Sequence, residues 1–292
     1  MKNILLLGKT GQVGFELHRV LSPLGSINAP SRAELDLTSA QAVTDYLTRS
    51  QPDLIVNAAA WTAVDAAEEQ QAKARRLNAG LPEQLAAYCS EQCAFLVHYS
   101  SDYVYPGKGT TPWKETSVTD PLNVYGQTKL EGDQAIQQSG CEHLIFRTSW
   151  VYSARGNNFM NTMVRLAKSK TELNIVADQI GSPTPARLIA QITAMAIRSN
   201  IPNGLYHLAA RGATSWNGFA REIFRLAKAQ GEQLTMGPEN ATAIPTSDYP
   251  TPARRPLNSR MDLNKLETAL NVQLPNWQSQ LVLTLNEYLE RS

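Results

Sequence analysis

The feature that most constrains this fold is a glycine-rich turn between a short apolar run and a helical segment near the N-terminus. Ile4-Leu5-Leu6-Leu7 leads into Gly8-Lys9-Thr10-Gly11-Gln12-Val13-Gly14. In a strand–turn–helix unit the first glycine permits the tight turn, the second lets backbone N–H groups approach a pyrophosphate, and the third lets helix and strand pack closely. The spacing is G-x-x-G-x-x-G rather than G-x-G-x-x-G, so the alternative is an ordinary glycine-rich turn, and only the flanking strand and helix favour nucleotide binding.

Short apolar runs alternate with longer helical segments, which predicts stacked βαβ units around a parallel sheet. The expected strands are residues 3–7, 26–29, 54–57, 95–100, 143–148, 173–176 and 205–208. The expected helices are 11–21, a segment after a capping box at Thr38, 82–92, 124–138, 158–169, 186–199 and 216–230. We therefore predict an α/β, Rossmann-type, doubly wound parallel sheet. Residues 1–149 would form the nucleotide-binding domain, and residues 150–292 mainly a smaller mixed substrate-binding lobe with segments returning to the first domain.

Composition excludes several classes of partner. The 292 residues carry 27 basic and 26 acidic side chains, a net charge of +1, which gives no basic field for nucleic acid. No apolar run is long enough to span a membrane, and the N-terminal run is too short for a signal peptide. The three cysteines form no C-x-x-C pair, which suits a reducing compartment; Cys89 and Cys93 are expected to be packing residues. We expect a cytoplasmic protein.

The end of the second expected strand bears on the choice of cofactor. It reads Asn28-Ala29-Pro30-Ser31-Arg32 and lacks the acidic residue that would bind the ribose 2′-hydroxyl of NAD. Ser31 and Arg32 can instead hold the 2′-phosphate of NADP, because a guanidinium matches a phosphate; the alternative is that Arg32 is a solvated loop charge. Asp36 and Leu37 are expected near the adenine. NADPH is favoured, with NADH as the alternative.

A second motif indicates proton transfer. Tyr125 and Lys129 are four residues apart in an expected helix and so share one face. A tyrosine with a pKa of ~10 is a poor acid–base group at neutral pH unless a cation favours its phenolate, and Lys129 can supply that cation. Ser101 ends an expected parallel strand at the edge where open α/β sheets bind ligands.

With these residues the chain resembles the extended short-chain dehydrogenase/reductases that act on nucleotide sugars, and more closely their dTDP-4-dehydrorhamnose reductase branch. The resemblance runs nearly end to end. It is carried by the glycine turn at 8–14, NAAAWTAVD at 57–65, SDYV at 101–104, PLNVYGQTK at 121–129, RTSWVY at 147–152 and RRPLNS at 254–259.

The resemblance implies NADPH-dependent reduction of the C4 ketone of dTDP-4-dehydro-β-L-rhamnose to dTDP-β-L-rhamnose, the last step of dTDP-L-rhamnose biosynthesis. Tyr125 would donate the proton to the carbonyl oxygen, Lys129 would tune Tyr125 and hold the nicotinamide ribose, and Ser101 would hydrogen-bond the carbonyl. The cofactor-binding positions are Gly8, Thr10, Gly11, Gln12, Val13, Gly14, Ser31, Arg32, Asp36, Leu37, Ala60, Trp61, Thr62, Tyr99, Tyr125 and Lys129. The substrate-binding positions are Ser101, Asp102, Trp150 and Arg255.

Some of these assignments have plain structural alternatives. Trp150 can be a core residue, Arg254 or Arg255 can be a surface arginine rather than a diphosphate ligand, and His98 is expected to be a core histidine with its polar atoms satisfied. Some relatives hold a divalent metal among carboxylates at a dimer interface. Glu16 matches one ligand position, but Arg187 stands where a carboxylate would be needed, so no metal site is assigned and both monomer and homodimer stay open.

Two classes of function compete with this one: another nucleotide-sugar enzyme and a non-catalytic binding subunit. A 4,6-dehydratase of this superfamily needs an Asp-Glu pair after the strand-end hydroxyl, and here Tyr103 follows Asp102, which argues against dehydration. An epimerase or another nucleotide-sugar 4-ketoreductase would use the same serine, tyrosine and lysine. A non-catalytic NADP-binding subunit, like the regulatory partner of methionine adenosyltransferase, is the alternative of a different class.

Overall fold

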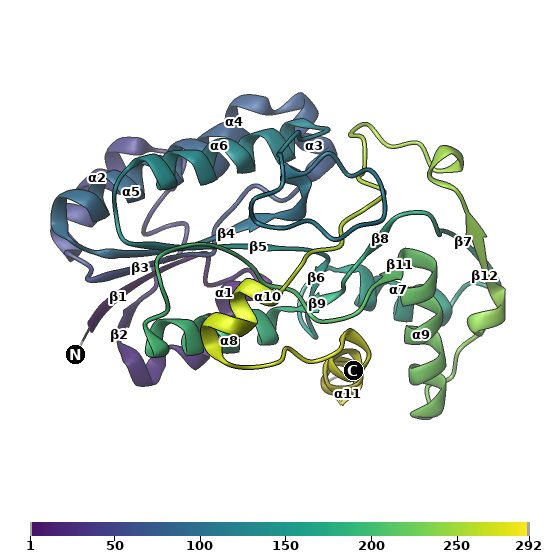
Figure 1. The fold of residues 1–292 in the computed structure, drawn as a ribbon. Coiled ribbons are helices and arrows are strands. Elements are labelled where there is room, and N and C mark those ends of the chain that lie inside the picture. The colour runs from purple at the N-terminus through teal and green to yellow at the C-terminus, as the bar shows by residue number, and fades with distance from the viewer. Residues whose placement is uncertain (1, 291–292) are drawn as a thin grey trace.

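The computed structural model describes residues 2–290, and a six-stranded parallel sheet lies at its centre (Figure 1). The strand order is β10-β5-β4-β3-β1-β2, with every neighbouring pair parallel. The strands are β1 (Lys2–Leu7), β2 (Gly25–Asn28), β3 (Leu54–Asn57), β4 (Phe95–Ser101), β5 (His143–Thr148) and β10 (Gly204–His207). The chain runs outward from β1 in both directions, which confirms the predicted doubly wound fold and places a ligand crevice at the carboxyl ends of the central strands.

Helices cover both faces of this sheet, α2, α5 and α6 on one and α1 and α8 on the other (Figure 1). Along β1 the side chains alternate between these layers: Leu5 and Leu7 belong to the cluster with α2 and α5, and Ile4 and Leu6 to the cluster with α1 and α8. The helices of these layers and their connections are α1 (Gln12–Val20), α2 (Ala40–Ser50), α3 (Val64–Glu69), α4 (Gln71–Arg75), the π-helical turn η2 (Arg76–Gly80), α5 (Leu81–Gln92), α6 (Val124–Gln138) and α8 (Ala186–Ser199).

Most of the remaining second half lies beyond the carboxyl ends of the sheet strands (Figure 1). The chain returns to the main sheet through α8, which packs on α1, and through β10, which pairs with β5. The other helices and strands are β6 (Val151–Tyr152), α7 (Phe159–Ala167), β7 (Leu173–Val176), β8 (Ile180–Gly181), β9 (Thr184–Pro185), β11 (Thr214–Ser215), α9 (Trp216–Ala229), β12 (Ala241–Ile244), α10 (Asn264–Leu270) and α11 (Trp277–Leu289). Short 3-10 turns are η1 (Ser22–Leu24), η3 (Asp102–Val104), η4 (Pro238–Asn240) and η5 (Thr246–Asp248).

All seven expected strands and seven expected helices form, with bounds shifted by a residue or two at most. The strand at 173–176 pairs with β12, which sequence reading missed, and not with the main sheet. The prediction that Thr38 caps this helix is wrong by one residue. Ser39 caps α2 by accepting a bond from the Ala42 N–H at 3.2 Å, while the Thr38 hydroxyl donates to Asp36 at 2.8 Å.

Two expectations from composition can be compared with the structure. Cys89 is buried as expected, but Cys93 is exposed at the end of α5 with φ +53°, so it is not a packing residue. No helix within residues 2–290 has both the length and the apolar character needed to cross a membrane. Met1 and residues 291–292, the outermost residues of the two expected domains, lie outside the described residues.

Candidate active site

A cavity of about 1390 Å³ lies at the carboxyl ends of the central strands. Its wall includes the segments that follow β1, β2, β3, β4 and β5, which is why residues far apart in sequence meet there. The expected site residues that line it are Gly8, Thr10, Gly11, Gln12, Val13, Ser31, Arg32, Asp36, Leu37, Ala60, Trp61, Thr62, Tyr99, Ser101, Asp102, Tyr125, Lys129 and Trp150. Gly14 and Arg255 do not line it.

The glycine turn forms one end of this cavity, and two of its glycines are required by geometry. Gly8 has φ +84°, a left-handed conformation that favours glycine. A Cβ on Gly14 would lie 2.0 Å from the Gly8 carbonyl oxygen, so Gly14 serves the close packing of α1 on the turn. The N-terminus of α1 therefore opens directly onto the cavity, and this cradle fits the pyrophosphate of a dinucleotide.

The next part of the wall is the loop after β2. Arg32 is exposed and makes no hydrogen bond or ion pair within residues 2–290, so its guanidinium is available to a phosphate. The Ser31 N–H is already used, because it donates to Glu34 Oε2 at 2.6 Å. Lys9 lies 4.0 Å from the same carboxylate and adds positive charge at this end of the cavity.

Tyr125 and Ser101 meet at the carboxyl end of β4. Asn123 caps α6 by accepting a bond from the Gly126 N–H at 2.8 Å, which sets the first turn that carries Tyr125. Burial raises the pKa of Tyr125 to about 12, and a hydrogen bond with Ser101 opposes that rise. The phenol is therefore protonated at neutral pH and can donate its proton. The pKa of Tyr125 is thus raised, because burial outweighs the opposing bond with Ser101, and the expectation that Lys129 tunes Tyr125 stays a prediction.

Asp102 sits beside this pair with 2% of its surface exposed. Its Oδ1 accepts a bond from the Ser101 hydroxyl at 3.2 Å, and its Oδ2 has no partner within the described chain. Burial raises the pKa of Asp102 to about 6, which hydrogen bonds from Ser259 and Ser101 counteract. A buried carboxylate oxygen without a partner in the cavity wall suits a ligand hydroxyl.

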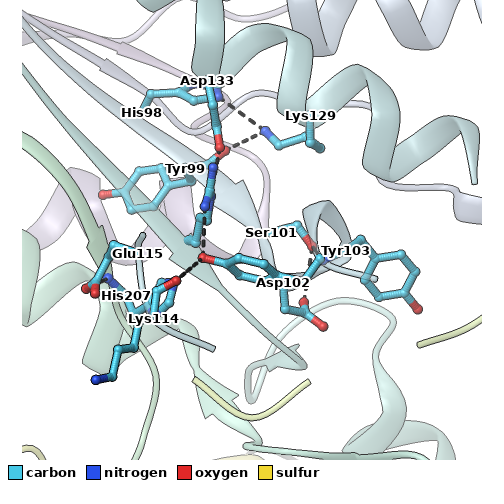
Figure 2. A network of polar contacts seen from close by, with 12 residues as sticks. His98, Tyr99, Ser101, Asp102, Tyr103, Lys114, Glu115, Lys129, Asp133 and His207 are labelled. Atoms are coloured by element: carbon cyan, nitrogen blue, oxygen red, sulfur yellow. Dashed lines mark hydrogen bonds and ion pairs between the residues drawn. The ribbon is translucent and has the colours of Figure 1, made fainter. Parts of the chain in front are cut away.

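Lys129 reaches the cavity from the same face of α6 as Tyr125, as its spacing predicts. Its Nζ donates to the Tyr99 carbonyl oxygen at 2.5 Å and lies 3.3 Å from His98 Nε2 (Figure 2). Burial lowers the pKa of Lys129 to about 8, and the Asp133 carboxylate pulls it back up. His98 is a buried histidine with both ring nitrogens bonded, as expected, but one of its partners is Lys129.

Trp150 belongs both to the cavity wall and to an aromatic stack. It has φ +49° and stacks on Trp216 with the ring centroids 3.6 Å apart. Gly181 packs so closely that a Cβ there would lie 2.6 Å from the Trp150 ring. The two alternatives for Trp150, ligand contact and packing, are therefore compatible in one residue.

The two loop arginines lie outside the cavity wall. Arg255 Nη2 bonds Asp65 Oδ2 at 2.6 Å, while the Arg254 side chain is exposed and its carbonyl accepts a bond from Asn123 Nδ2 at 2.7 Å. These contacts fasten the proline-rich loop to the starts of α3 and α6. The structure thus brings neither guanidinium to the cavity, and a diphosphate contact by Arg255 stays a prediction.

Sequence reading missed three residues that shape the site. Trp216 lines the cavity and completes the aromatic stack; Ser259 bonds Asp102; and Asn78 bonds the backbone of Trp61 and the hydroxyl of Thr128. Trp216 starts an expected helix and Ser259 belongs to a motif of the resemblance, but nothing local in the sequence indicates their partners.

The residues at the metal position of some relatives do not fit a metal here. Arg187 bonds both carboxylate oxygens of the buried Glu16 at 3.3 Å and lies 2.7 Å from Glu287. A guanidinium therefore occupies the place between these two carboxylates that a divalent cation would need. No group of three His, Cys, Asp or Glu side chains suited to a metal exists among residues 2–290.

From the ion pair between Arg187 and Glu16 we predict how Mg²⁺ affects the thermal stability of the protein. We expect the melting temperature of the wild type to be the same in EDTA and in millimolar Mg²⁺. Arg187→Glu replaces the guanidinium by a third carboxylate, so Mg²⁺ should stabilise that variant because oxygen ligands bind Mg²⁺. Thermal unfolding with and without Mg²⁺ measures both. Stabilisation of the wild type by Mg²⁺ would show that Arg187 does not take the place of a metal.

Comparison with known proteins agrees with the arrangement of the glycine turn, Ser101, Tyr125 and Lys129 around one cavity. The family model described as RmlD substrate binding domain matches residues 1–290. The chain is 49% identical to dTDP-4-dehydrorhamnose reductase of Shigella flexneri, over 98% of this chain and 97% of that protein. The chain belongs to the dTDP-4-dehydrorhamnose reductase family.

Solved structures support this membership. The dTDP-4-dehydrorhamnose reductase of Clostridium acetobutylicum is 33% identical, with a TM-score of 0.89 over 99% of both chains. That of Bacillus anthracis, solved in complex with NADP, is 31% identical, with a TM-score of 0.88 over 100% of both. Membership in the reductase family confirms the resemblance drawn from the sequence, and the NADP complex agrees with a glycine cradle that fits a dinucleotide.

Proposed function

We propose that this chain reduces the C4 ketone of dTDP-4-dehydro-β-L-rhamnose to dTDP-β-L-rhamnose with NADPH, the last step of dTDP-L-rhamnose biosynthesis. The observation that carries the proposal is a single cavity whose wall joins a glycine cradle for a dinucleotide to a buried tyrosine, serine and lysine. Cofactor and carbonyl can therefore meet at one place. Membership in the family supplies the choice of sugar.

In this reaction the residues at the end of β4 handle the carbonyl. When bound, the reduced nicotinamide supplies the hydride that is added to the sugar C4 carbon. Tyr125, protonated because burial keeps its pKa high, gives its proton to the C4 oxygen, and Ser101 hydrogen-bonds the same oxygen. The ketone thus becomes an alcohol, and Tyr125 is left as a phenolate that solvent must reprotonate. Positive charge on Lys129 would stabilise that phenolate.

The remaining wall orients the two ligands. The backbone of the Gly8–Gly14 turn would hold the pyrophosphate of the cofactor, and Lys129 its nicotinamide ribose. Asp102 offers its unpartnered oxygen to a sugar hydroxyl, and the indole of Trp150 faces the cavity held by Trp216 and Gly181. We further propose that residues 1–149 form the cofactor domain and that residues 150–292 form mainly the substrate lobe. The protein would act in the cytoplasm as a monomer or homodimer.

A turnover assay tests this function. Loss of NADPH absorbance is expected when purified protein meets the 4-keto sugar nucleotide, with dTDP-β-L-rhamnose as product. An epimerase would interconvert sugars without consuming NADPH. Binding of NADPH without its oxidation by any 4-keto-6-deoxy sugar nucleotide would favour the non-catalytic subunit and reject the reductase.

The exposed guanidinium of Arg32 makes a prediction about cofactor choice. If Arg32 holds the 2′-phosphate, Arg32→Ala removes a charge-assisted bond that NADH never makes. We expect the KM for NADPH to rise about tenfold, the equivalent of ~1.4 kcal/mol, and the KM for NADH to stay nearly constant. Steady-state kinetics with both cofactors measures this. Equal effects on both would mean that Arg32 is only a solvated charge.

A further inference from the structure

Trp150 holds a backbone conformation that a bulky residue rarely adopts. Its φ is +49°, in the left-handed region where a Cβ crowds the backbone. Such strain persists only where the surrounding structure imposes it, and strained residues are concentrated at active sites and ligand clamps. Because Trp150 lines the cavity, the contacts that impose its conformation also shape the cavity wall.

Few contacts fix the Trp150 ring directly. Its indole N–H makes no hydrogen bond within residues 2–290. Its carbonyl accepts a bond from the Thr184 N–H at 3.2 Å, which anchors the backbone and not the ring. The ring itself lies between the close approach of Gly181 and a parallel stack on Trp216, with an angle of 8° between the two indole planes. The orientation of Trp150 therefore depends on the orientation of Trp216.

Trp216, unlike Trp150, is fixed by a hydrogen bond. Its Nε1 donates to Gln179 Oε1 at 3.1 Å. An indole N–H can only donate, so the Gln179 amide turns its oxygen toward Trp216 and its nitrogen away from it. That nitrogen, Nε2, donates to Thr246 Oγ1 at 3.1 Å, and the Thr246 hydroxyl donates to Asp178 Oδ1 at 2.6 Å. The bonds thus run in one direction from an indole to a carboxylate, and each strengthens the next.

The backbone places Gln179 and Trp216 opposite each other. β8 pairs with β11 in the register Ser215↔Ile180, so the next residue along each strand is Trp216 on one and Gln179 on the other (Figure 1). Gln179 is buried, with 8% of its surface exposed, and it does not line the cavity. A buried amide with both ends bonded has one orientation, because turning it would leave donors facing donors. Trp216 is therefore held rigidly from behind.

We propose that Trp216 and Gln179 are positioning residues that hold the Trp150 indole as a fixed wall for the sugar nucleotide, and so set the affinity for this substrate and not the rate of the chemical step. The inference rests on the proposed function, in which Trp150 contacts the substrate. The carbonyl is handled from β4 and α6, whereas Trp216 and Gln179 belong to α9 and to the segment before β8. Loosening Trp150 should weaken ground state and transition state alike, which raises KM and leaves kcat nearly unchanged.

The support that Gln179 gives to Trp150 can be measured without a ligand. NMR of the indole N–H groups gives one signal for each of the five tryptophans. The Trp150 signal is the one lost in Trp150→Phe, or is found by elimination with the same change at the other four. The ring current of Trp216 shifts this signal, which therefore reports how the two rings lie.

Gln179→Leu keeps both indoles and removes only the bonds behind them, so the Trp150 signal should move or broaden. Gln191→Leu makes the same chemical change on the exposed face of α8 and should leave the signal in place. A Trp150 signal that is identical in the wild type and in Gln179→Leu would overturn the proposal, whether or not the protein is a reductase.

Kinetics tests the role in affinity. Trp216→Leu removes the stack, and we expect the KM for the sugar nucleotide to rise about tenfold, with kcat and the KM for NADPH within about threefold of the wild type. Gln179→Leu unfastens the stack, and this KM should rise about threefold. Trp216→Phe keeps an aromatic ring against Trp150 and should retain more affinity than Trp216→Leu. Calorimetry with dTDP-β-L-rhamnose should show the same losses without turnover.

Trp277→Leu is the matched control for Trp216→Leu. Trp277 is a buried tryptophan of the same half of the chain, packed edge-on to Phe219 and outside the cavity wall, so its loss should not change the KM for the sugar nucleotide. If Trp216→Leu does not fold, Gln179→Leu and Trp216→Phe carry the test.

Two kinetic outcomes would overturn the role in affinity. One is an unchanged KM for the sugar nucleotide in Gln179→Leu and both Trp216 variants, and the other is a fall in kcat as large as the rise in KM. Failure of the proposed function looks different. In that case the wild type itself would neither oxidise NADPH nor bind dTDP-β-L-rhamnose, while its Trp150 signal would still respond to Gln179→Leu.

Discussion

Tyr125→Phe is expected to lower kcat for NADPH-dependent reduction of the 4-keto sugar nucleotide by about 10²- to 10⁴-fold, with little change in NADPH affinity. The phenol is the protonated group held beside Ser101 at the end of β4, and burial keeps it protonated at neutral pH. Phenylalanine preserves the ring and removes only the transferable proton. Steady-state kinetics and fluorescence titration with NADPH separate the two effects.

Tyr103→Phe is the matched control for that experiment. Tyr103 also lines the cavity, with its ring edge-on to Tyr125 and the centroids 5.4 Å apart. This variant also loses one phenolic hydroxyl from a residue of the cavity wall. The proposed mechanism gives the Tyr103 hydroxyl no role, so kcat should change by less than about tenfold. If the two variants were equally impaired, the proton donor would be misassigned.

Arg147→Met is expected to lower the free energy of unfolding by about 3–5 kcal/mol, the largest effect on stability that we predict. Arg147 is 3% exposed and its Nε donates to Asp133 Oδ2 at 2.9 Å, while Nη1 donates to the Tyr105 hydroxyl at 2.8 Å. Asp133 is completely buried and its other oxygen has no partner in residues 2–290. Removing the guanidinium leaves this carboxylate uncompensated in the core.

Urea unfolding measures this loss, and two further variants test its cause. Arg75→Met breaks the exposed pair with Glu131, also 2.9 Å long, and should cost no more than about 1 kcal/mol because solvent screens that pair. The double variant Arg147→Met with Asp133→Leu removes both charges and should recover much of the lost stability. Equal losses for Arg147→Met and Arg75→Met would show that burial of the pair does not matter.

Much of the fold could be predicted because its determinants are local. The alternation of apolar runs and helical segments gave every strand of the main sheet, and the flanking context of Gly8 gave the cofactor end of the cavity. Other elements were missed, such as the π-helical turn before α5 and the two C-terminal helices α10 and α11. The strand at 173–176 was found, but its partner β12 lies nearly 70 residues further along the chain, and no pattern indicates such a pairing.

The features of the site also divide into those that the local sequence predicts and those that it does not. Spacing alone placed Tyr125 and Lys129 on one face of a helix, and strand position placed Ser101 beside them. The partners of these groups were not predictable. His98 looked like any buried histidine until the register between β3 and β4 set it opposite Asn57, and Arg255 looked like a free arginine until the loop brought it to Asp65.

The sequence by itself determined a Rossmann-type fold, a dinucleotide cradle and a tyrosine–lysine pair, because each depends on neighbours within a few residues and on the periods of helix and strand. The tertiary structure alone decided the charge environment: that Arg187 binds Glu16, that Arg147 pairs with Asp133, and that the imidazole of His98 lies against Lys129. Those contacts join side chains 14 to 171 residues apart. Protonation depends on burial and on such partners, neither of which the local sequence contains.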